Sequence, residues 1–567
     1  MTTTFADKIR MQNLLFSELS RMFGKEVPLY DKSLLINREC NQTVCALLGR
    51  RYPGFSLSDE QLDKASGERH GAIRIGRRDE YRWICKFFDA FGMEPHNYYD
   101  MTNVGAKSQP IVATAFRSRI NPEHRVFCSL LMTDYFDPQT RERIESALAN
   151  RQVFSDRAKE LVDKNAAQGG LSEEDARELI REGTERIFKW TGKAHDYQLY
   201  QDLSKAGFKI AADIACFDSH HLNHLTPNTF CMDLYTSAMK FCLGEIDQAV
   251  FSERATDALK RLAGFADRDY MKLHFKHLSR EDILAFGEGT VSDSDIADFV
   301  SRLTARLQEP EYVLTKLKHS GFKDYTEGPA VGVPVLLRQD AYKALTEPVT
   351  FVETDGSTVD SAHTARFGEI EQRFYATTPA GRKLYDECLA ASEEIKKEKP
   401  DLVKNDFFAY QEAYGKCFAP FPKTLSELLE QKLVYGRYSV TPEGRAAAQA
   451  GNVTTADLGE LVRLGYVYAE GLRYEDFLPV SAAGIFASNL GQYGTKSTAA
   501  EKPVYTQEAL EEILGRPIVD SNDTYRALEA ASILEVYREL GLLGKVSETD
   551  RAALEEAAAD LPAAVAA

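Results

Sequence analysis

The chain has 567 residues but no uninterrupted apolar run of about 20 residues, the length that a membrane-spanning helix requires. Its first 24 residues carry charges throughout and lack the apolar core of a secretory signal peptide. The nine cysteines are odd in number and form no CxxC pair, which favours a reduced compartment over a disulfide framework. We therefore expect a cytoplasmic protein without a membrane segment.

Basic side chains are outnumbered by acidic ones. There are 69 lysines and arginines against 86 aspartates and glutamates, a formal charge of −17. Nucleic acids and membrane surfaces are anionic, so this balance argues against both as general partners. An anionic substrate would need a local positive pocket. A hydrophobic fraction of 44% and a charged fraction of 27% are typical of an ordinary globular protein.

Patterns along the chain alternate between strand-like and helix-like segments. Short alternating runs predict strands between residues 66 and 135, and the pattern becomes helical between 139 and 205. The run KIAADIACFDSHHLNHLTP, residues 209–227, predicts a buried strand that ends at Pro227. Charged amphipathic helices follow, and strand patterns then resume. These alternations predict an α+β fold.

The same patterns predict a divided core. We expect residues 1–232 to hold the N-terminal helices and the first part of the core, and residues 313–495 to hold the second part. Residues 233–312 are expected to form a helical insertion, and residues 496–567 a C-terminal helical extension.

The predicted insertion contains two histidines, His274 and His277, at helical spacing. Lys272 and Lys276 lie beside them, and these cations disfavour a metal site. We therefore expect both histidines to be surface residues.

The segment ERHGAIRIG places two functional side-chain types on one face of a predicted strand. Side chains alternate along a strand, so His70, Ala72 and Arg74 share a face. The α-carbons of His70 and Arg74 are then about 13 Å apart, which suits a metal at one end and a short acid reaching the arginine. A buried histidine and an ordinary ion-pair arginine would also explain the pattern.

Three histidines cluster in the segment SHHLNHLTP. His220 and His224 share a face if the segment is a strand, whereas only a helical turn would bring His221 and His224 together. A hydrogen-bonded turn would explain the cluster without a metal.

The segment HTARFGEIEQRF places Glu369 and Glu371 on one strand face together with Phe367 and Arg373. A carboxylate that faces inward needs a cation or a metal, because burying it alone is too costly. One of these glutamates with His70 and a second histidine would complete a set of two histidines and one carboxylate, which suits Fe(II).

A fourth segment, DFLPVSAAGIFASNLG, is rich in small residues. Its backbone can approach a ligand closely, and the amides beside Val480 and Ser481 are candidates to hold a carboxylate. A tightly packed turn of small residues would have the same composition.

Four segments together, ERHGAIR, HLNHLTP, HTARFGEIEQR and YEDFLPVSAAGIFASNLG, resemble the signature blocks of the 2-oxoadipate dioxygenase/decarboxylase family, also called hydroxyglutarate synthase. The resemblance extends from about residue 15 to 495. It implies a vicinal-oxygen-chelate fold, in which a mixed β-sheet core wraps around a metal and helices surround it.

The resemblance also implies an activity and a metal. The family converts 2-oxoadipate and O2 to D-2-hydroxyglutarate and CO2, a step of lysine catabolism, with Fe(II) as cofactor. His70 and His224 would bind the iron with a glutamate of FGEIEQR, and we favour Glu371 over Glu369.

The resemblance further implies how the substrate is bound. Arg74 would bind the 2-oxo dicarboxylic acid, with His70, Val480 and Ser481 lining the same pocket. Substrate and O2 are thus the expected partners, and the oligomeric state is left open. The predicted insertion and Phe374, where the family pattern suggests glycine, depart from the compact members.

Two other functions are compatible with these residues. One is a different vicinal-oxygen-chelate metalloenzyme, an isomerase or a hydrolase acting on a small 2-oxo acid. The other is a binding protein in which the metal only stabilises the fold. Consumption of O2 with a 2-oxo acid would distinguish the predicted dioxygenase from both of these alternatives.

Overall fold

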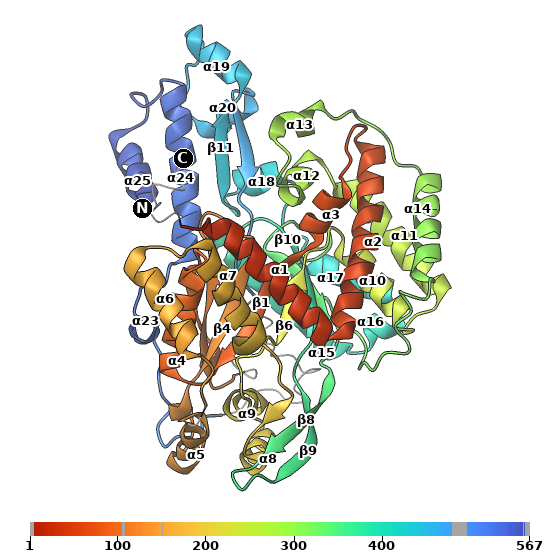
Figure 1. The fold of residues 1–567 in the computed structure, drawn as a ribbon. Coiled ribbons are helices and arrows are strands. Elements are labelled where there is room, and N and C mark those ends of the chain that lie inside the picture. The colour runs from red at the N-terminus through yellow and green to blue at the C-terminus, as the bar shows by residue number, and fades with distance from the viewer. Residues whose placement is uncertain (1–4, 105–107, 150, 479–495, 560, 562–567) are drawn as a thin grey trace.

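The computed structural model describes residues 5–104, 108–149, 151–478, 496–559 and 561 (Figure 1). Helices surround a central mixed β-sheet, which confirms the α+β prediction. No helix in these ranges is both long enough and apolar enough to cross a bilayer. Val480 and Ser481 lie outside the described residues.

A five-stranded mixed sheet forms the centre of the molecule. β1 is parallel to β4, and all other neighbouring strands are antiparallel. β1 and β4 are almost entirely buried, as expected for strands that are covered on both faces. In spatial order the strands are β2 (Glu94–Asp100), β3 (Ile111–Arg117), β4 (Arg125–Leu131), β1 (Glu68–Ile75) and β6 (His224–Pro227).

A two-stranded antiparallel sheet of β7 (Leu337–Ala341) and β10 (Glu369–Arg373) lies next to β6. The backbone N–H of Thr229 donates to the carbonyl oxygen of Glu371 at 2.8 Å, and Asn228 forms a parallel bridge with the same residue. The chain segment that ends β6 thus runs directly into contact with β10. Three strands from distant parts of the sequence, β1, β6 and β10, are brought side by side.

Helices of the N-terminal part cover the sheet. α1 begins after Asp7, whose side chain accepts a hydrogen bond from the backbone N–H of Arg10, and Ser172 caps α7 in the same way by accepting from the backbone N–H of Asp175. These helices are α1 (Lys8–Glu26), α2 (Pro28–Arg51), α3 (Asp59–Ser66), α4 (Arg78–Asp89), α5 (Pro138–Ala149), α6 (Asp156–Gln168), α7 (Glu173–Glu182), α8 (Tyr197–Lys205) and α9 (Lys209–Cys216), with short turns η1 (Met101–Asn103), η3 (Thr133–Tyr135) and η4 (Gly183–Ile187).

The structure corrects the prediction for residues 209–227. Residues 209–216 form helix α9, and only residues 224–227 form a strand. A short buried apolar run has no periodicity that separates a helix from a strand, and its three alanines favour the helix.

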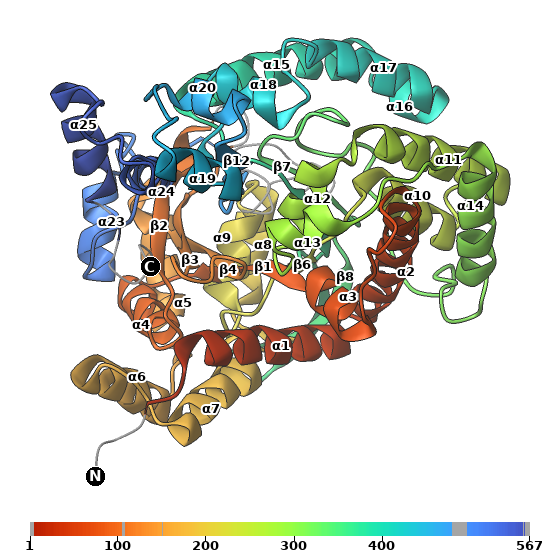
Figure 2. The same cartoon turned by 90° about the horizontal axis from the view of Figure 1, so that it is seen from above.

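The predicted helical insertion packs into the main core. Phe251, Leu259 and Leu303 belong to the same buried apolar cluster as Leu15 of α1 and Leu47 of α2. Figure 2 shows α10, α11 and α14 packed beside α2. The helices of this segment are α10 (Met232–Cys242), α11 (Gln248–Phe265), α12 (Arg268–His274), α13 (Arg280–Ala285) and α14 (Asp293–Leu307).

The expectation that His274 is a surface residue is wrong. Its side chain is buried, its Nδ1 lies 3.0 Å from the carbonyl oxygen of Tyr270, and its ring stacks on the Tyr270 ring. His277 is exposed, as expected.

The remaining elements form two small sheets and the outer helices. β11 packs on α24 (Figure 1). These elements are β5 (Lys193–Ala194), β8 (Thr346–Val352), β9 (Thr358–Thr364), β11 (Gly436–Val440), β12 (Val467–Gly471), α15 (Pro379–Glu398), α16 (Leu402–Asn405), α17 (Phe407–Cys417), α18 (Leu425–Glu430), α19 (Pro442–Gln449), α20 (Leu458–Arg463), α23 (Gln507–Leu514), α24 (Ser521–Glu539) and α25 (Glu548–Ala558).

Gly71 allows β6 to approach β1 closely. A Cβ atom at this position would lie 3.0 Å from Leu225 Cδ2 and 3.2 Å from the carbonyl oxygen of His224. We expect Gly71→Val to lower the free energy of unfolding by about 1–3 kcal/mol, because overpacking forces neighbouring atoms apart. Urea unfolding measures this change. Gly264→Val on α11 is the control, because a Cβ there meets nothing within 4 Å. Equal losses in the two variants would contradict the close approach.

Candidate metal centre

Two histidines and a glutamate meet where β1, β6 and β10 adjoin. His70, His224 and Glu369 offer ligand atoms that all lie within 4.8 Å of one another, and all three side chains are buried. Glu369 Oε2 is 3.2 Å from His70 Nε2 and 3.5 Å from His224 Nε2. His224 lies opposite Ala72 in the β1–β6 register, so the small side chain leaves room for both rings. We call these three residues the donor group.

The donor group contains buried polar atoms that other described residues do not satisfy. Both ring nitrogens of His224 and Oε1 of Glu369 have no hydrogen-bond partner among the residues that the structure describes. Burial lowers the pKa of His224 well below its usual value, and the nearby His70 and Arg74 lower it further. His224 is therefore neutral at physiological pH and offers a lone pair. Unpaired buried polar atoms are costly, and a divalent cation would satisfy them.

Glu371 lies on the other side of the His70 ring. Its Oε2 is 2.7 Å from His70 Nδ1, and Arg373 contacts both of its oxygens, at 2.6 Å from Nε and 2.8 Å from Nη2. Arg125 Nη1 lies 3.3 Å from Oε1. An ionised carboxylate only accepts hydrogen bonds, so the short contact with Glu371 favours a proton on Nδ1 of His70. Nε2 faces Glu369 and lies 2.9 Å from the Thr226 hydroxyl, which can donate to it.

This arrangement departs from the expectation that Glu371 is the ligand. Glu369 is the glutamate that the structure brings together with the two histidines, whereas Glu371 is engaged by Arg373 and Arg125. Burial raises the pKa of Glu369, and the contact with His70 only partly opposes that effect. For Glu371, burial is again the largest contribution and raises the pKa, but Arg373, His70 and Arg125 together hold it well below its usual range.

A network of charges extends from buried Glu371 to the exposed Lys276. Arg125 pairs with Glu475, whose other oxygen is 2.9 Å from Lys276 Nζ. Arg373 Nη1 also donates to the carbonyl oxygens of Tyr474 and Asp476. Lys276 belongs to the segment that was predicted to be an insertion, so that segment contributes to the surroundings of the site. In the sequence, Arg125 at the start of the run RVFCSLL was the available signal for this network.

Arg74 is buried on β1 and pairs with Asp213 of α9, with 2.6 Å between Nη1 and Oδ2. The other oxygen of Asp213 lies 3.3 Å from His221 Nε2 and 3.0 Å from His363 Nε2. Tyr200 extends this chain of contacts, with its hydroxyl 2.9 Å from His363 Nδ1. Asp213 and His363 were missed by the sequence reasoning.

The clustered histidines have separate roles. His224 alone belongs to the donor group, whereas His221 faces Asp213 and His220 lies 3.7 Å from Glu80. His220 and His224 do not share a strand face, because residues 220–223 lie outside any strand.

Comparisons with known proteins give one consistent result. The sequence profile of the 2-oxoadipate dioxygenase/decarboxylase family matches residues 15–245 and 245–489. Relatives of that name from Pseudomonas putida and Escherichia coli are 33% and 32% identical, over 94% and 93% of this chain and 97% of each relative. The chain belongs to this family. The crystal structure of Pseudomonas putida hydroxyglutarate synthase in complex with 2-oxoadipate superimposes with a TM-score of 0.65 at 31% identity, covering 95% of this chain and 99% of that one.

In this family member an aromatic side chain closes one side of the donor group. The Phe477 ring lies 4.9 Å from the His70 ring, measured between centroids. Phe477 also lines a cavity of about 920 Å³ together with Tyr99, Tyr474 and Tyr525. Val480 and Ser481, the expected pocket residues, follow Phe477 closely in the sequence.

The two glutamates are expected to differ in what they contribute to stability. Glu371→Gln leaves Arg125 and Arg373 buried beside a neutral amide, so we expect a loss of about 3–5 kcal/mol in the free energy of unfolding at pH 7. Glu369→Gln removes a carboxylate that no arginine contacts, so we expect a loss of less than about 1 kcal/mol in metal-free protein. Urea unfolding of chelator-treated protein measures both, and equal losses would contradict the assignment.

The effect of Glu371→Gln is also expected to depend on pH. Because the pKa of Glu371 is lower in the folded state, its stabilisation is complete above its unfolded pKa of about 4.3. It is lost as the pH falls through the folded pKa. The difference in the free energy of unfolding between wild type and Glu371→Gln should therefore narrow below about pH 4.3. A constant difference from pH 7 to pH 3 would argue against stabilisation by ionised Glu371.

Proposed function

We propose that this chain is an Fe(II)-dependent dioxygenase that converts 2-oxoadipate and O2 to D-2-hydroxyglutarate and CO2. The observation that carries this proposal is the buried donor group, with its unpaired donor atoms, in a chain whose relatives bear that enzyme name. The solved relative from Pseudomonas putida holds 2-oxoadipate, which supports a 2-oxo diacid as substrate. The reaction is balanced, because the CO2 carries the two oxygens of the released carboxylate and both atoms of O2 enter the hydroxy acid, one in the new carboxylate and one in the hydroxyl.

His70, His224 and Glu369 are the proposed iron ligands. Two imidazoles and one carboxylate suit Fe(II) and leave positions for other ligands, and iron held there would polarise the 2-oxo acid and activate O2. Glu371 keeps the His70 proton on Nδ1, so that Nε2 stays available to the metal. Phe477 and the burial of all three ligands keep bulk water away from the reacting atoms.

Arg74 is the proposed anchor for the distal carboxylate of the substrate. It shares a face of β1 with His70, so an acid of fixed length would span the distance between the metal and the guanidinium. Asp213 holds Arg74 Nη1, which fixes the direction of the planar fork. Val480 and Ser481 complete the proposed pocket.

Oxygen consumption tests the proposed reaction directly. The purified protein is loaded anaerobically with Fe(II), mixed with 2-oxoadipate and O2, and analysed for O2 uptake and for the chirality of the hydroxy acid. We expect one CO2 and one D-2-hydroxyglutarate for each O2 consumed. The absence of uptake with every 2-oxo diacid of five to seven carbons would refute the proposal, whereas turnover without O2 would identify an isomerase or a hydrolase.

Substitutions at the proposed ligands should remove the metal. We expect His70→Ala, His224→Ala and Glu369→Ala to lose bound iron and nearly all turnover, because each removes one of three protein ligands. Arg74→Lys should retain iron but raise KM, since lysine lacks the planar fork. Iron content after gel filtration and steady-state kinetics measure these effects. Stoichiometric iron in Glu369→Ala would refute the assignment of this ligand.

Asp213 is expected to act as a positioning residue. Asp213→Asn weakens a charge-assisted contact of about 1.5–3 kcal/mol, so we expect KM for 2-oxoadipate to rise about ten- to a hundred-fold with iron retained and a smaller change in kcat. Asp202→Asn is the control, because Asp202 also pairs with an arginine, Arg143, but at the surface. An unchanged KM, or loss of iron from Asp213→Asn, would exclude a role through Arg74.

A further inference from the structure

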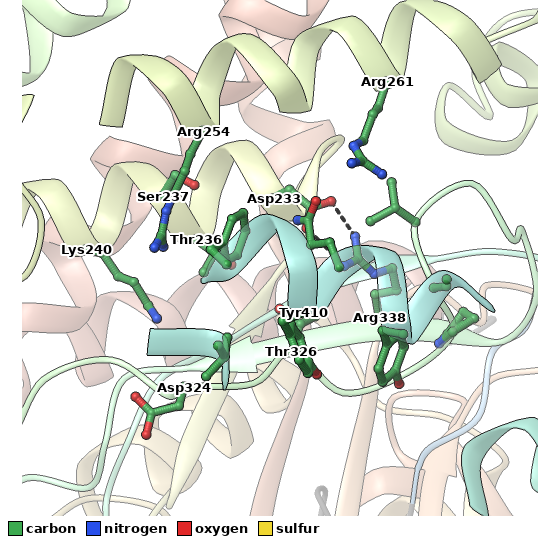
Figure 3. Close-up of a pocket in the computed structure, with 18 residues that line it drawn as sticks. Asp233, Thr236, Ser237, Lys240, Arg254, Arg261, Asp324, Thr326, Arg338 and Tyr410 are labelled. Atoms are coloured by element: carbon green, nitrogen blue, oxygen red, sulfur yellow. Dashed lines mark hydrogen bonds and ion pairs between the residues drawn. The ribbon is translucent and has the colours of Figure 1, made fainter. Parts of the chain in front are cut away.

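A second polar cavity lies away from the donor group, between helices α10, α11 and α17 (Figure 3). It encloses about 70 Å³, roughly five times the smallest volume that holds one water molecule. That space suits an ion of four or five heavy atoms. None of His70, His224 or Glu369 lines it.

Two cations of this cavity have no ionic partner. Lys240 of α10 and Arg254 of α11 are both partly buried, and neither forms an ion pair with any residue in the described ranges. Arg254 stacks on the Phe407 ring, with 4.0 Å between its guanidinium carbon and the ring centroid, which orients the side chain without neutralising its charge. Two neighbouring cations without a direct ion pair leave guanidinium and ammonium hydrogens available to an anion.

The acidic side chains of the cavity are already neutralised. Asp233 forms two hydrogen bonds with Arg338, at 2.7 and 3.0 Å, and Asp324 lies 3.4 Å from Lys404. Figure 3 shows Asp233 paired with Arg338, on the side of the cavity away from Lys240. Neither of these two acids forms an ion pair with Lys240 or Arg254.

Burial disfavours the charged forms of both cations. It lowers the pKa of Lys240, and the charge of Arg254 lowers that pKa further, although Asp340, Glu245 and Asp324 raise it in part. Burial likewise lowers the pKa of Arg254. An anion between the two side chains would reverse these costs, and the hydroxyls of Ser237 and Tyr410 that line the cavity are suitable hydrogen-bond donors.

We propose that this cavity binds a compact oxyanion, a phosphate group or one of similar size and charge, through Lys240 and Arg254. We call it the oxyanion pocket. Its Arg338 lies on β7, opposite Gln372 of β10, so the oxyanion pocket adjoins the strand that carries Glu369. The proposal does not depend on the reaction proposed above, because binding can be measured without metal or substrate.

Binding of inorganic phosphate tests the oxyanion pocket. Calorimetric titration of the full-length protein at constant ionic strength, with chloride as the reference anion, should give saturable binding of one phosphate per chain. Parallel titrations with sulfate and succinate distinguish a site for tetrahedral anions from one for carboxylates. No saturable heat with phosphate or sulfate above the chloride reference would overturn the proposal.

Substitutions locate the bound anion. We expect Lys240→Gln and Arg254→Gln each to weaken phosphate binding about ten-fold or more, because each removes a charge-assisted hydrogen bond. Lys260→Gln and Arg302→Gln are the controls, since they remove exposed cations of α11 and α14 that do not line the cavity. Equal weakening in controls and test variants would show that the anion responds only to overall charge, and would refute the pocket.

A measurement on the wild-type protein remains informative if a variant fails to fold. Acetic anhydride modifies accessible lysines, and mass spectrometry quantifies modification at Lys240 and at the exposed Lys260. Phosphate should reduce modification of Lys240 at least five-fold, an order-of-magnitude expectation for a site that is mostly occupied, and leave Lys260 unchanged. Equal modification of Lys240 with and without phosphate would overturn the proposal.

Discussion

The site depends on how one strand buries two carboxylates. Glu369 and Glu371 lie on the same face of β10, and both are almost completely inaccessible to solvent. Arg373 and Arg125 neutralise Glu371, so it can hold His70 in one tautomer. Glu369 receives no such cation from the described residues, and its charge is left for a metal to balance. An arginine beside Glu369 would remove the need for a metal, and the loss of Arg373 would leave two competing carboxylates.

Much of this arrangement could be predicted from local patterns. The alternation in ERHGAIRIG predicts the shared face of His70 and Arg74, and the matching segment is the buried strand β1. The four signature segments identify the family, which the comparisons confirm. The choice between Glu369 and Glu371 could not be made in this way, because alternation places both on one face. It depends on which carboxylate Arg373 and Arg125 contact, and Arg125 is 246 residues away from Glu371 in the sequence.

Other parts of the structure are hard to predict for the same physical reason. Residues 233–312 are charged and amphipathic, a pattern that an insertion and a core layer share, and Phe251 and Leu303 lie in the same buried apolar cluster as residues of α1 and α2. The assignment of this segment as an insertion stays a prediction. Three neighbouring histidines face three different partners because the backbone between α9 and β6 is irregular. Periodicity predicts which side chains share a face only in regular helices and strands. It therefore does not predict the positions of functional side chains in irregular connections such as this one.

The distance along the chain between the ligands bears on biosynthesis. His70 and Glu369 are 299 residues apart, with His224 between them. A nascent chain of 224 to 368 residues therefore contains both histidines of the donor group but not its glutamate. Metal binding at the donor group therefore requires that β10 has been translated and has joined β6. A prematurely terminated product would be unable to assemble the centre, however well its N-terminal sheet had folded.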